Sequence, residues 1–130
     1  MISRSEGETN LSVLLRSIQP FHNPGEYVFC TVTSAQSNLD CHALGWFQEA
    51  EGCTLILPRE VAEQFQLSYS AVFAWITLSV HSSLSAVGFL AAITQTLAAH
   101  GISVNPVSAY YHDHLFVPID RAEQVMSLLQ

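Results

Sequence analysis

The second half of the chain contains the stretch that decides the fold, VFAWITLSVHSSLSAVGFLAAITQTLAAHGISV at residues 72–104. Residues 72–80 are apolar almost without interruption, which is typical of a central strand with both faces covered. Residues 81–83 then add two serines whose hydroxyls suit a helix cap. The apolar positions of a long helix follow at helical spacing: Ala86, Leu90, Ile93 and Leu97. Gly101 stands where a left-handed C-terminal cap is expected, so the stretch predicts a strand followed by a helix.

The residues after this helix predict two more strands and another helix. Residues 102–104 alternate into one strand, and residues 115–118 form a return strand. Pro106 cannot donate to a sheet ladder, so a strand that contains it belongs at an edge or carries a bulge. Asp120 followed by Glu123 is typical of a capping box at the start of a last helix. The predicted order of this half is therefore β-α-β-β-α.

The first third of the chain is less regular. A short helix is expected over residues 11–18, because its leucines and isoleucine recur at helical spacing. Pro20 and the turn signal at residues 23–25 are expected to end it. The β-branched and aromatic residues 27–32 then predict a strand.

A hairpin and a second short helix are expected next. Residues 43–48 and 53–57 are extended stretches on either side of the tight turn signal Glu51-Gly52. Pro58 suits the first turn of a helix, since its missing N–H costs nothing there. The first half thus also predicts strands followed by a helix.

The charge and cysteine content exclude several function classes. Eleven acidic residues against four basic ones give a net charge of −7, which repels a phosphate backbone and an anionic membrane surface. No apolar run approaches the roughly 18 residues of a membrane-spanning helix. The three cysteines lack the paired spacing of zinc or redox motifs and are expected to be reduced. We therefore expect a cytoplasmic protein that binds neither nucleic acid nor membrane.

Three segments of the second half resemble an ACT domain. They are SSLSAVG at residues 82–88, HGIS at residues 100–103 and YHDHLFVP at residues 111–118. Together with EGCTLILP at residues 51–58, they resemble a family of small bacterial proteins with tandem ACT-like repeats. The resemblance implies an α+β fold, a ferredoxin-like sandwich of two tandem repeats whose antiparallel sheets are covered by helices.

The resemblance divides the chain into a divergent N-terminal ACT-like half, residues 1–70, and a C-terminal ACT-like domain, residues 71–130. Both depart from the βαββαβ order of ACT domains, because the second half lacks its last strand and the first half lacks its first strand. A sheet with a missing strand leaves backbone groups unpaired, so we expect the halves to complete one another. Strands are exchanged either within one chain or between the two chains of a homodimer, and the sequence leaves both open.

A ligand site is predicted at the strand-to-helix junction of the second half, residues 81–88. The start of a helix offers free backbone N–H groups and a positive dipole end, which suit the carboxylate of an amino acid. The resemblance implies these ligand-binding candidates at the junction: Ser82, Ser83, Leu84, Val87 and Gly88. The structural alternative is that the serines only cap the helix and the glycine only permits close packing.

Three further candidates lie on the strands that follow. Asp113 matches an acidic position of related ACT domains and could pair with the ammonium group of an amino acid, or it serves as an ordinary turn residue. Asn105 could reach the same ligand from the neighbouring strand, or it makes a local backbone bond. His112 is a ligand-binding candidate that shares one strand face with His114, but spacing supplies no third metal ligand. No metal and no other cofactor is predicted.

Motifs for catalysis are not found in the sequence. There is no Gly-x-Ser-x-Gly elbow, no phosphate-binding glycine loop and no His-Glu-x-x-His. Cys41 and His42 are adjacent, and on a strand they would point to opposite faces. The sequence therefore predicts a regulatory or sensor protein that binds a small molecule, such as an amino acid, and is not an enzyme. The alternative is a dimerisation or interaction module for a partner protein, without a small-molecule ligand.

Overall fold

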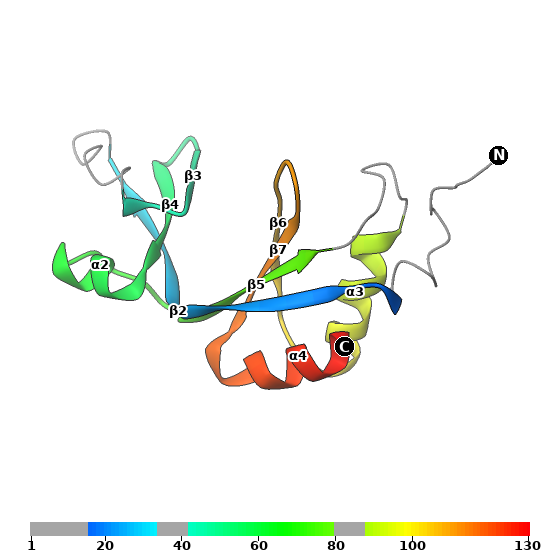
Figure 1. Cartoon of the computed structure of the whole chain (residues 1–130). Helices are drawn as coiled ribbons and strands as arrows, with labels where there is room; N and C mark the ends of the chain where they lie inside the picture. The colour runs from blue at the N-terminus through cyan, green and yellow to red at the C-terminus, as the bar shows by residue number, and fades with distance from the viewer. Residues whose placement is uncertain (1–15, 34–41, 80–87) are drawn as a thin grey trace.

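The computed structural model describes residues 16–33, 42–79 and 88–130. Their strands form one six-stranded sheet with the order β3-β4-β2-β5-β7-β6, in which every pairing is antiparallel (Figure 1). The strands are β2 (Gln19–Val32), β3 (Gly45–Gln48), β4 (Cys53–Pro58), β5 (Phe73–Ser79), β6 (Asn105–Ser108) and β7 (Asp113–Pro118). The helices are α2 (Arg59–Gln64), α3 (Phe89–Ala99) and α4 (Ala122–Leu129), the last preceded by a 3-10 turn at Ile119–Arg121. The predicted α+β architecture with antiparallel strands is confirmed.

The long strand β2 joins the two halves of the sheet. Its first part, residues 19–23, pairs with β5, and its second part, residues 27–32, pairs with β4. Between the two parts the register shifts at a bulge. Gly25 lies in this bulge with φ of 101°, a left-handed conformation that glycine adopts readily. One chain therefore completes its own sheet, and the segment exchanged between the halves is the first part of β2.

Two predictions about this region are wrong. Pro20 does not end a helix, because it pairs with Leu78 inside the β2–β5 ladder. Residues 23–25 do not separate two elements, because β2 continues through them as a bulge. A bulge tolerates Pro24, which has no N–H to give to a ladder. The predicted helix at residues 11–18 lies mostly outside the described residues.

The two halves repeat one unit of hairpin and helix. The segment LILPREVAEQ, which begins at Leu55, recurs as LFVPIDRAEQ, which begins at Leu115. Every residue pair between β3 and β4 corresponds to a pair between β6 and β7 sixty residues later. The hairpin predicted around Glu51-Gly52 is confirmed, and the second half contains its counterpart.

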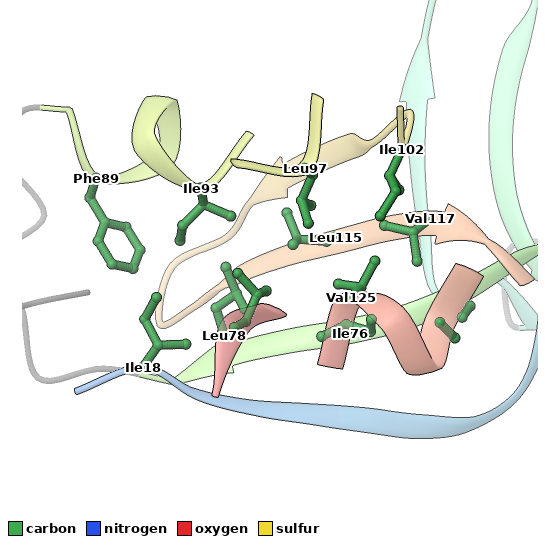
Figure 2. Close-up of a cluster of buried hydrophobic side chains, with 13 residues drawn as sticks. Ile18, Ile76, Leu78, Phe89, Ile93, Leu97, Ile102, Leu115, Val117 and Val125 are labelled. Carbon is green, nitrogen blue, oxygen red and sulfur yellow. The ribbon is translucent and has the colours of Figure 1, made fainter. Parts of the chain in front are cut away.

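The helices cover one face of the sheet over two core clusters. The larger cluster packs α3 and α4 on β5 and β7, and Figure 2 shows Phe89, Ile93 and Leu97 of α3 directed toward the strands. The smaller cluster packs α2 on β2 and β4, with these buried residues: Val28, Cys30, Val32, Leu55, Leu57 and Ala62. Ile93 and Leu97 are almost fully buried, which confirms the apolar stripe predicted for this helix.

Neither α3 nor α4 begins as predicted. The N-cap of α3 is Gly88, whereas the serines expected to cap it, at residues 82–83, lie outside the described residues. The N-cap of α4 is Arg121, and no side-chain hydrogen bond caps this helix. The capping box expected from Asp120 does not form because the chain passes through a 3-10 turn after Pro118 before α4 begins.

The sheet ends at β3 on one side and at β6 on the other. Pro106 lies in β6, so the prediction that its strand is an edge strand is confirmed. Among the helices within the described ranges, none has the length and apolar character needed to cross a membrane.

Candidate functional site

The predicted ligand junction falls partly within the described residues. Ser82, Ser83, Leu84 and Val87 lie outside them, and their role stays a prediction. Gly88 is the N-cap of α3 with φ of 87°, a left-handed conformation that costs a residue with a side chain about 1 kcal/mol or more. This left-handed conformation alone is a sufficient reason for a glycine at position 88, without a ligand. Among the described residues, no side chain caps this end of α3 with a hydrogen bond.

Asp113 lies beside the end of β5. In the β5–β7 register it stands opposite Leu78, one residue before the last residue of β5. One carboxylate oxygen of Asp113, Oδ1, accepts a hydrogen bond from Ser108 Oγ at 2.6 Å. Figure 2 shows Phe89, the first residue of α3, at the same end of the larger core cluster as Leu78. The fold therefore brings Asp113 and the start of α3 to one end of β5.

Asn105 lies elsewhere on the sheet. It stands opposite Phe116 in the β6–β7 register, and its side-chain amide donates to the Phe116 carbonyl at 3.5 Å. Ser108, the partner of Asp113, is three residues further along β6, which is roughly 10 Å of strand. The structure does not bring Asn105 together with Asp113.

His112 lies at the end of the turn between β6 and β7. Its Nδ1 atom is buried and has no hydrogen-bond partner among the described residues. Its ring centre is 6.4 Å from those of Tyr111 and His114. Within residues 16–33, 42–79 and 88–130, no three histidine, cysteine or acidic side chains gather closely enough to hold a metal ion.

His114 belongs to a polar network that the sequence did not indicate. Trp75 Nε1–H donates to His114 Nδ1 at 3.0 Å, and Thr77 Oγ1 lies 3.1 Å from the same nitrogen. Asn23, in the first part of β2, donates to Thr77 Oγ1 at 2.9 Å and to the Trp75 carbonyl at 3.2 Å. The network thus connects β2, β5 and β7 on the sheet face opposite the helices.

The hydrogen bonds of this network determine the tautomer of the neutral His114 ring. Nδ1 accepts from Trp75, so the neutral ring carries its proton on Nε2. Burial lowers the pKa of His114, the neighbouring His112 lowers it further, and Asp113 partly offsets both effects. The network therefore favours an uncharged His114.

An aromatic cluster covers the same helix-free face, and it consists of Tyr27, Phe29, Phe73, Trp75 and Phe116. Phe29 of β2 meets Phe73 and Phe116 edge to face, with ring centres 5.4 and 5.5 Å apart. Trp75 stacks on Phe116 at 6.5 Å and meets Tyr27 edge to face at 5.5 Å. The sequence predicted that both faces of β5 are covered, and the cluster supplies the cover on the face without helices.

Within the described part of the chain, two pockets lie on the first half of the sheet. One, of about 620 Å³, is lined by Phe29, Cys30, Thr31, Glu49, Thr54, Ser68, Tyr69 and Ser70. The other, of about 570 Å³, lies at the β2 bulge and is lined by Pro24, Gly25, Glu26, Tyr27, Pro58, Arg59, Glu60 and Glu63. Both volumes are within the range of small-molecule sites.

The charges of the pocket at the β2 bulge are largely paired. Arg59 bonds to Glu26 at 2.9 Å, to Tyr69 at 2.9 Å and to Glu63 at 3.2 Å. These bonds, to Glu26 first, raise the pKa of Arg59. The hydrogen bonds from Tyr69 and Arg59 lower the pKa of Glu63. Arg59 is therefore already engaged, and the pocket is a weak candidate for an anionic ligand.

Family models match the chain over almost its whole length. Two models, each described as an ACT domain, match residues 6–74 and residues 70–130. No curated protein matches the chain.

Solved structures share the fold. A protein of unknown function from Vibrio cholerae, described as a possible transport protein, is 45% identical with a TM-score of 0.85, covering 95% of this chain and 96% of that one. The aspartokinase alpha and beta subunits are 13% identical with a TM-score of 0.58, covering 85% of this chain and 93% of that one. The aspartate kinase of Clostridium acetobutylicum, described as an allosteric enzyme, is 10% identical with a TM-score of 0.59. The match covers 87% of this chain and 34% of the kinase chain.

Proposed function

Because this chain belongs to the ACT domain family, we propose that it is a regulatory protein that binds a small molecule, with a free amino acid as the ligand class. Two ACT domains account for nearly the whole chain, and neither family model describes a catalytic domain. The proposal therefore includes no catalysis by the chain itself. An allosteric aspartate kinase contains a region of the same fold, which is consistent with a regulatory role.

The observation that carries the proposal is the pair of complementary groups at the end of β5. The first N–H groups of α3, beginning at Gly88, suit the carboxylate of an amino acid. The carboxylate of Asp113 suits its ammonium group, because Ser108 engages only one of the two oxygens. In this proposal the junction residues Ser82, Ser83, Leu84 and Val87 line the ligand between them.

A thermal-shift screen against the twenty amino acids tests the proposal. A ligand present at about 100 times its Kd stabilises the folded chain by about 2.7 kcal/mol, which raises the melting temperature by roughly 10 °C for a chain of this size. Asp113→Asn should abolish the shift, because the amide carries no charge to pair with ammonium. Asp120→Asn is the matched control, since it removes the same charge from an exposed position. A wild-type chain that no amino acid stabilises would contradict the proposal.

A second candidate function is an interaction module for a partner protein. Tyr110 and Tyr111 form the tip of the β6–β7 hairpin and are 78% and 80% exposed. Exposed tyrosines are common anchors at protein interfaces. This function predicts no shift with any amino acid and a partner whose binding is lost when both tyrosines are replaced by serine.

Two related expectations are also proposals. We place the protein in the cytoplasm, because Cys30 and Cys53 are free thiols and the chain is acidic. We also keep residue 70 as the boundary between the halves, although the first part of β2 contributes a strand to the second half.

A further inference from the structure

The pocket of about 620 Å³ on the first half of the sheet combines hydroxyl groups, aromatic rings and a carboxylate. Its lining comes from β2, the β3–β4 hairpin and the loop that precedes β5. Thr31 stands opposite Thr54 in the β2–β4 register, so their side chains share one face of the sheet. Ser68 and Ser70 add hydroxyls from the loop. Glu49 is the charged residue of this lining.

The turn between β3 and β4 holds Glu49 in the pocket lining. The N–H of Glu49 donates to the carbonyl of Gly52 at 2.9 Å, and Thr54 Oγ1 donates to Glu49 Oε1 at 2.5 Å. Gly52 lies against β2, since a Cβ atom there would come within 2.8 Å of Thr31 Oγ1. The carboxylate is therefore held beside the hydroxyls of both strands. Among the described residues, no group bonds to its other oxygen, Oε2.

The internal repeat shows that the hairpin itself does not need this carboxylate. In the second half, Ala109 corresponds to Glu49, and its N–H makes the same bond to the carbonyl of His112 at 2.9 Å. Thr54 corresponds to His114 in the two hairpin registers. The turn therefore forms with an alanine at this position, and the Glu49 side chain is left for another role.

The chain itself supplies little positive charge to Glu49. It has four arginines, no lysine and eleven acidic residues. Arg59 donates to the hydroxyl of Tyr69, which lines the pocket, at 2.9 Å, but its charge is paired with Glu26 and Glu63. Within the described ranges, no basic side chain pairs with Glu49. A ligand that carries its own positive charge would therefore supply what this pocket lacks.

We propose that this pocket binds a small organic amine, with a primary ammonium group on an aromatic or hydroxylated body. The ammonium group donates to Oε2 of Glu49 in a charge-assisted hydrogen bond. The rings of Phe29 and Tyr69 contact the body of the amine. A carboxylate on the ligand would face the like charge of Glu49, so zwitterionic amino acids are disfavoured. The pocket shares no residue with the candidate site at the end of β5, so this proposal is independent of the proposed function.

Titration of the isotope-labelled full chain with phenethylamine, followed by NMR, tests the amine site. The backbone amide signals of Glu49, Thr54 and Ser70 should shift, whereas those of Gly88 and Asp113 should not. Phenylethanol carries a hydroxyl in place of the ammonium group, so its Kd should be at least about tenfold higher, because the charge-assisted hydrogen bond is lost. Phenylalanine adds a carboxylate, and its Kd for this pocket should also be at least about tenfold higher.

Two carboxylates of the same turn provide a matched pair of variants. Glu49→Gln keeps an acceptor for Thr54 and removes only the charge, so its Kd for phenethylamine should rise at least about tenfold. Glu51→Gln is the control, because Glu51 is exposed and does not line the pocket, and its Kd should stay that of the wild type. Glu49→Ala should fold, since Ala109 occupies the same position in the second hairpin, and it should lose binding to the same extent.

Three results would overturn the amine site. They are pocket amides that phenethylamine does not shift at millimolar concentration, equal Kd values for phenethylamine and phenylethanol, and equal Kd values for Glu49→Gln and Glu51→Gln. Shifts confined to Gly88 and Asp113 would put the amine at the other site and would also contradict the proposal. The thermal-shift screen uses amino acids and Asp113→Asn instead, so either proposal can fail without the other.

Discussion

Phe116 connects the two halves of the sheet across the helix-free face, and its replacement by alanine should destabilise the fold strongly. Its side chain is 2% exposed and contacts Phe29 of the first half and Trp75 of the second. Truncating a buried phenylalanine to alanine costs about 3–5 kcal/mol, through lost burial and the cavity that remains. Phe116→Leu keeps most of the volume and loses two ring contacts of about 0.5–1.5 kcal/mol each, so its cost should be about 1–3 kcal/mol.

Urea unfolding, monitored by circular dichroism and tryptophan fluorescence, measures the loss in the free energy of unfolding for Phe116→Ala and for Phe116→Leu. Val107→Ala is the matched control, because Val107 lies on the neighbouring strand β6, is 38% exposed, and should cost less than about 1 kcal/mol. A loss for Phe116→Ala below about 1.5 kcal/mol, or no larger than that of the control, would refute the inference that this ring holds the halves together.

Three other substitutions test particular contacts. Folding lowers the pKa of His114, so the unfolded chain binds a proton at this side chain more readily than the folded chain. The contribution of neutral His114 to the free energy of unfolding is therefore present above about pH 6.5 and is lost as the pH falls below it. Between about pH 8 and about pH 5, the free energy of unfolding in urea should therefore fall less for His114→Gln than for the wild type. An equal fall for both proteins would contradict the network. Gly88→Ala should cost about 1 kcal/mol because φ is 87°, and an unchanged melting temperature would show that this backbone conformation is wrong. Asn23→Ala should cost about 1–3 kcal/mol through two lost hydrogen bonds, and a double-mutant cycle with Thr77→Val that shows no coupling would exclude the bond between them.

Elements with strong local signals could be predicted from the sequence. The hairpin around Glu51-Gly52 has a turn signal between two extended stretches, and it forms where expected. The stripe containing Ile93 and Leu97 specified the buried face of α3. Pro106 specified an edge strand because a proline cannot donate within a sheet.

The joining strand β2 could not be predicted in this way. Pro20, Pro24 and Gly25 are locally typical of a helix end and a turn, and a strand through them is stable only because β5 and β4 pair with its two parts. Tertiary pairing therefore overrode the local preference. The exchange of a strand between the halves was expected from the missing strands, but the segment that supplies it was not identified.

The candidate site could be predicted only in part. The sequence indicates both Asp113 and Gly88: the β5–β7 register sets Asp113 opposite Leu78 near the end of β5, and Gly88 is the N-cap of α3. Asn105 was grouped with them because it lies on a neighbouring strand, but the register sets it opposite Phe116 instead. The network around His114 was missed because it depends on which residues of three strands stand side by side, and a single strand does not reveal that.

A crystal structure of the full chain grown with the amino acid that gives the largest thermal shift would test the ligand proposal most directly. We predict that its carboxylate lies against the first N–H groups of α3 beside Gly88 and its ammonium group within hydrogen-bond distance of Asp113. Amino-acid density bound only elsewhere, such as beside Glu49 on the first half, or a junction filled by the side chains of the chain itself, would contradict it.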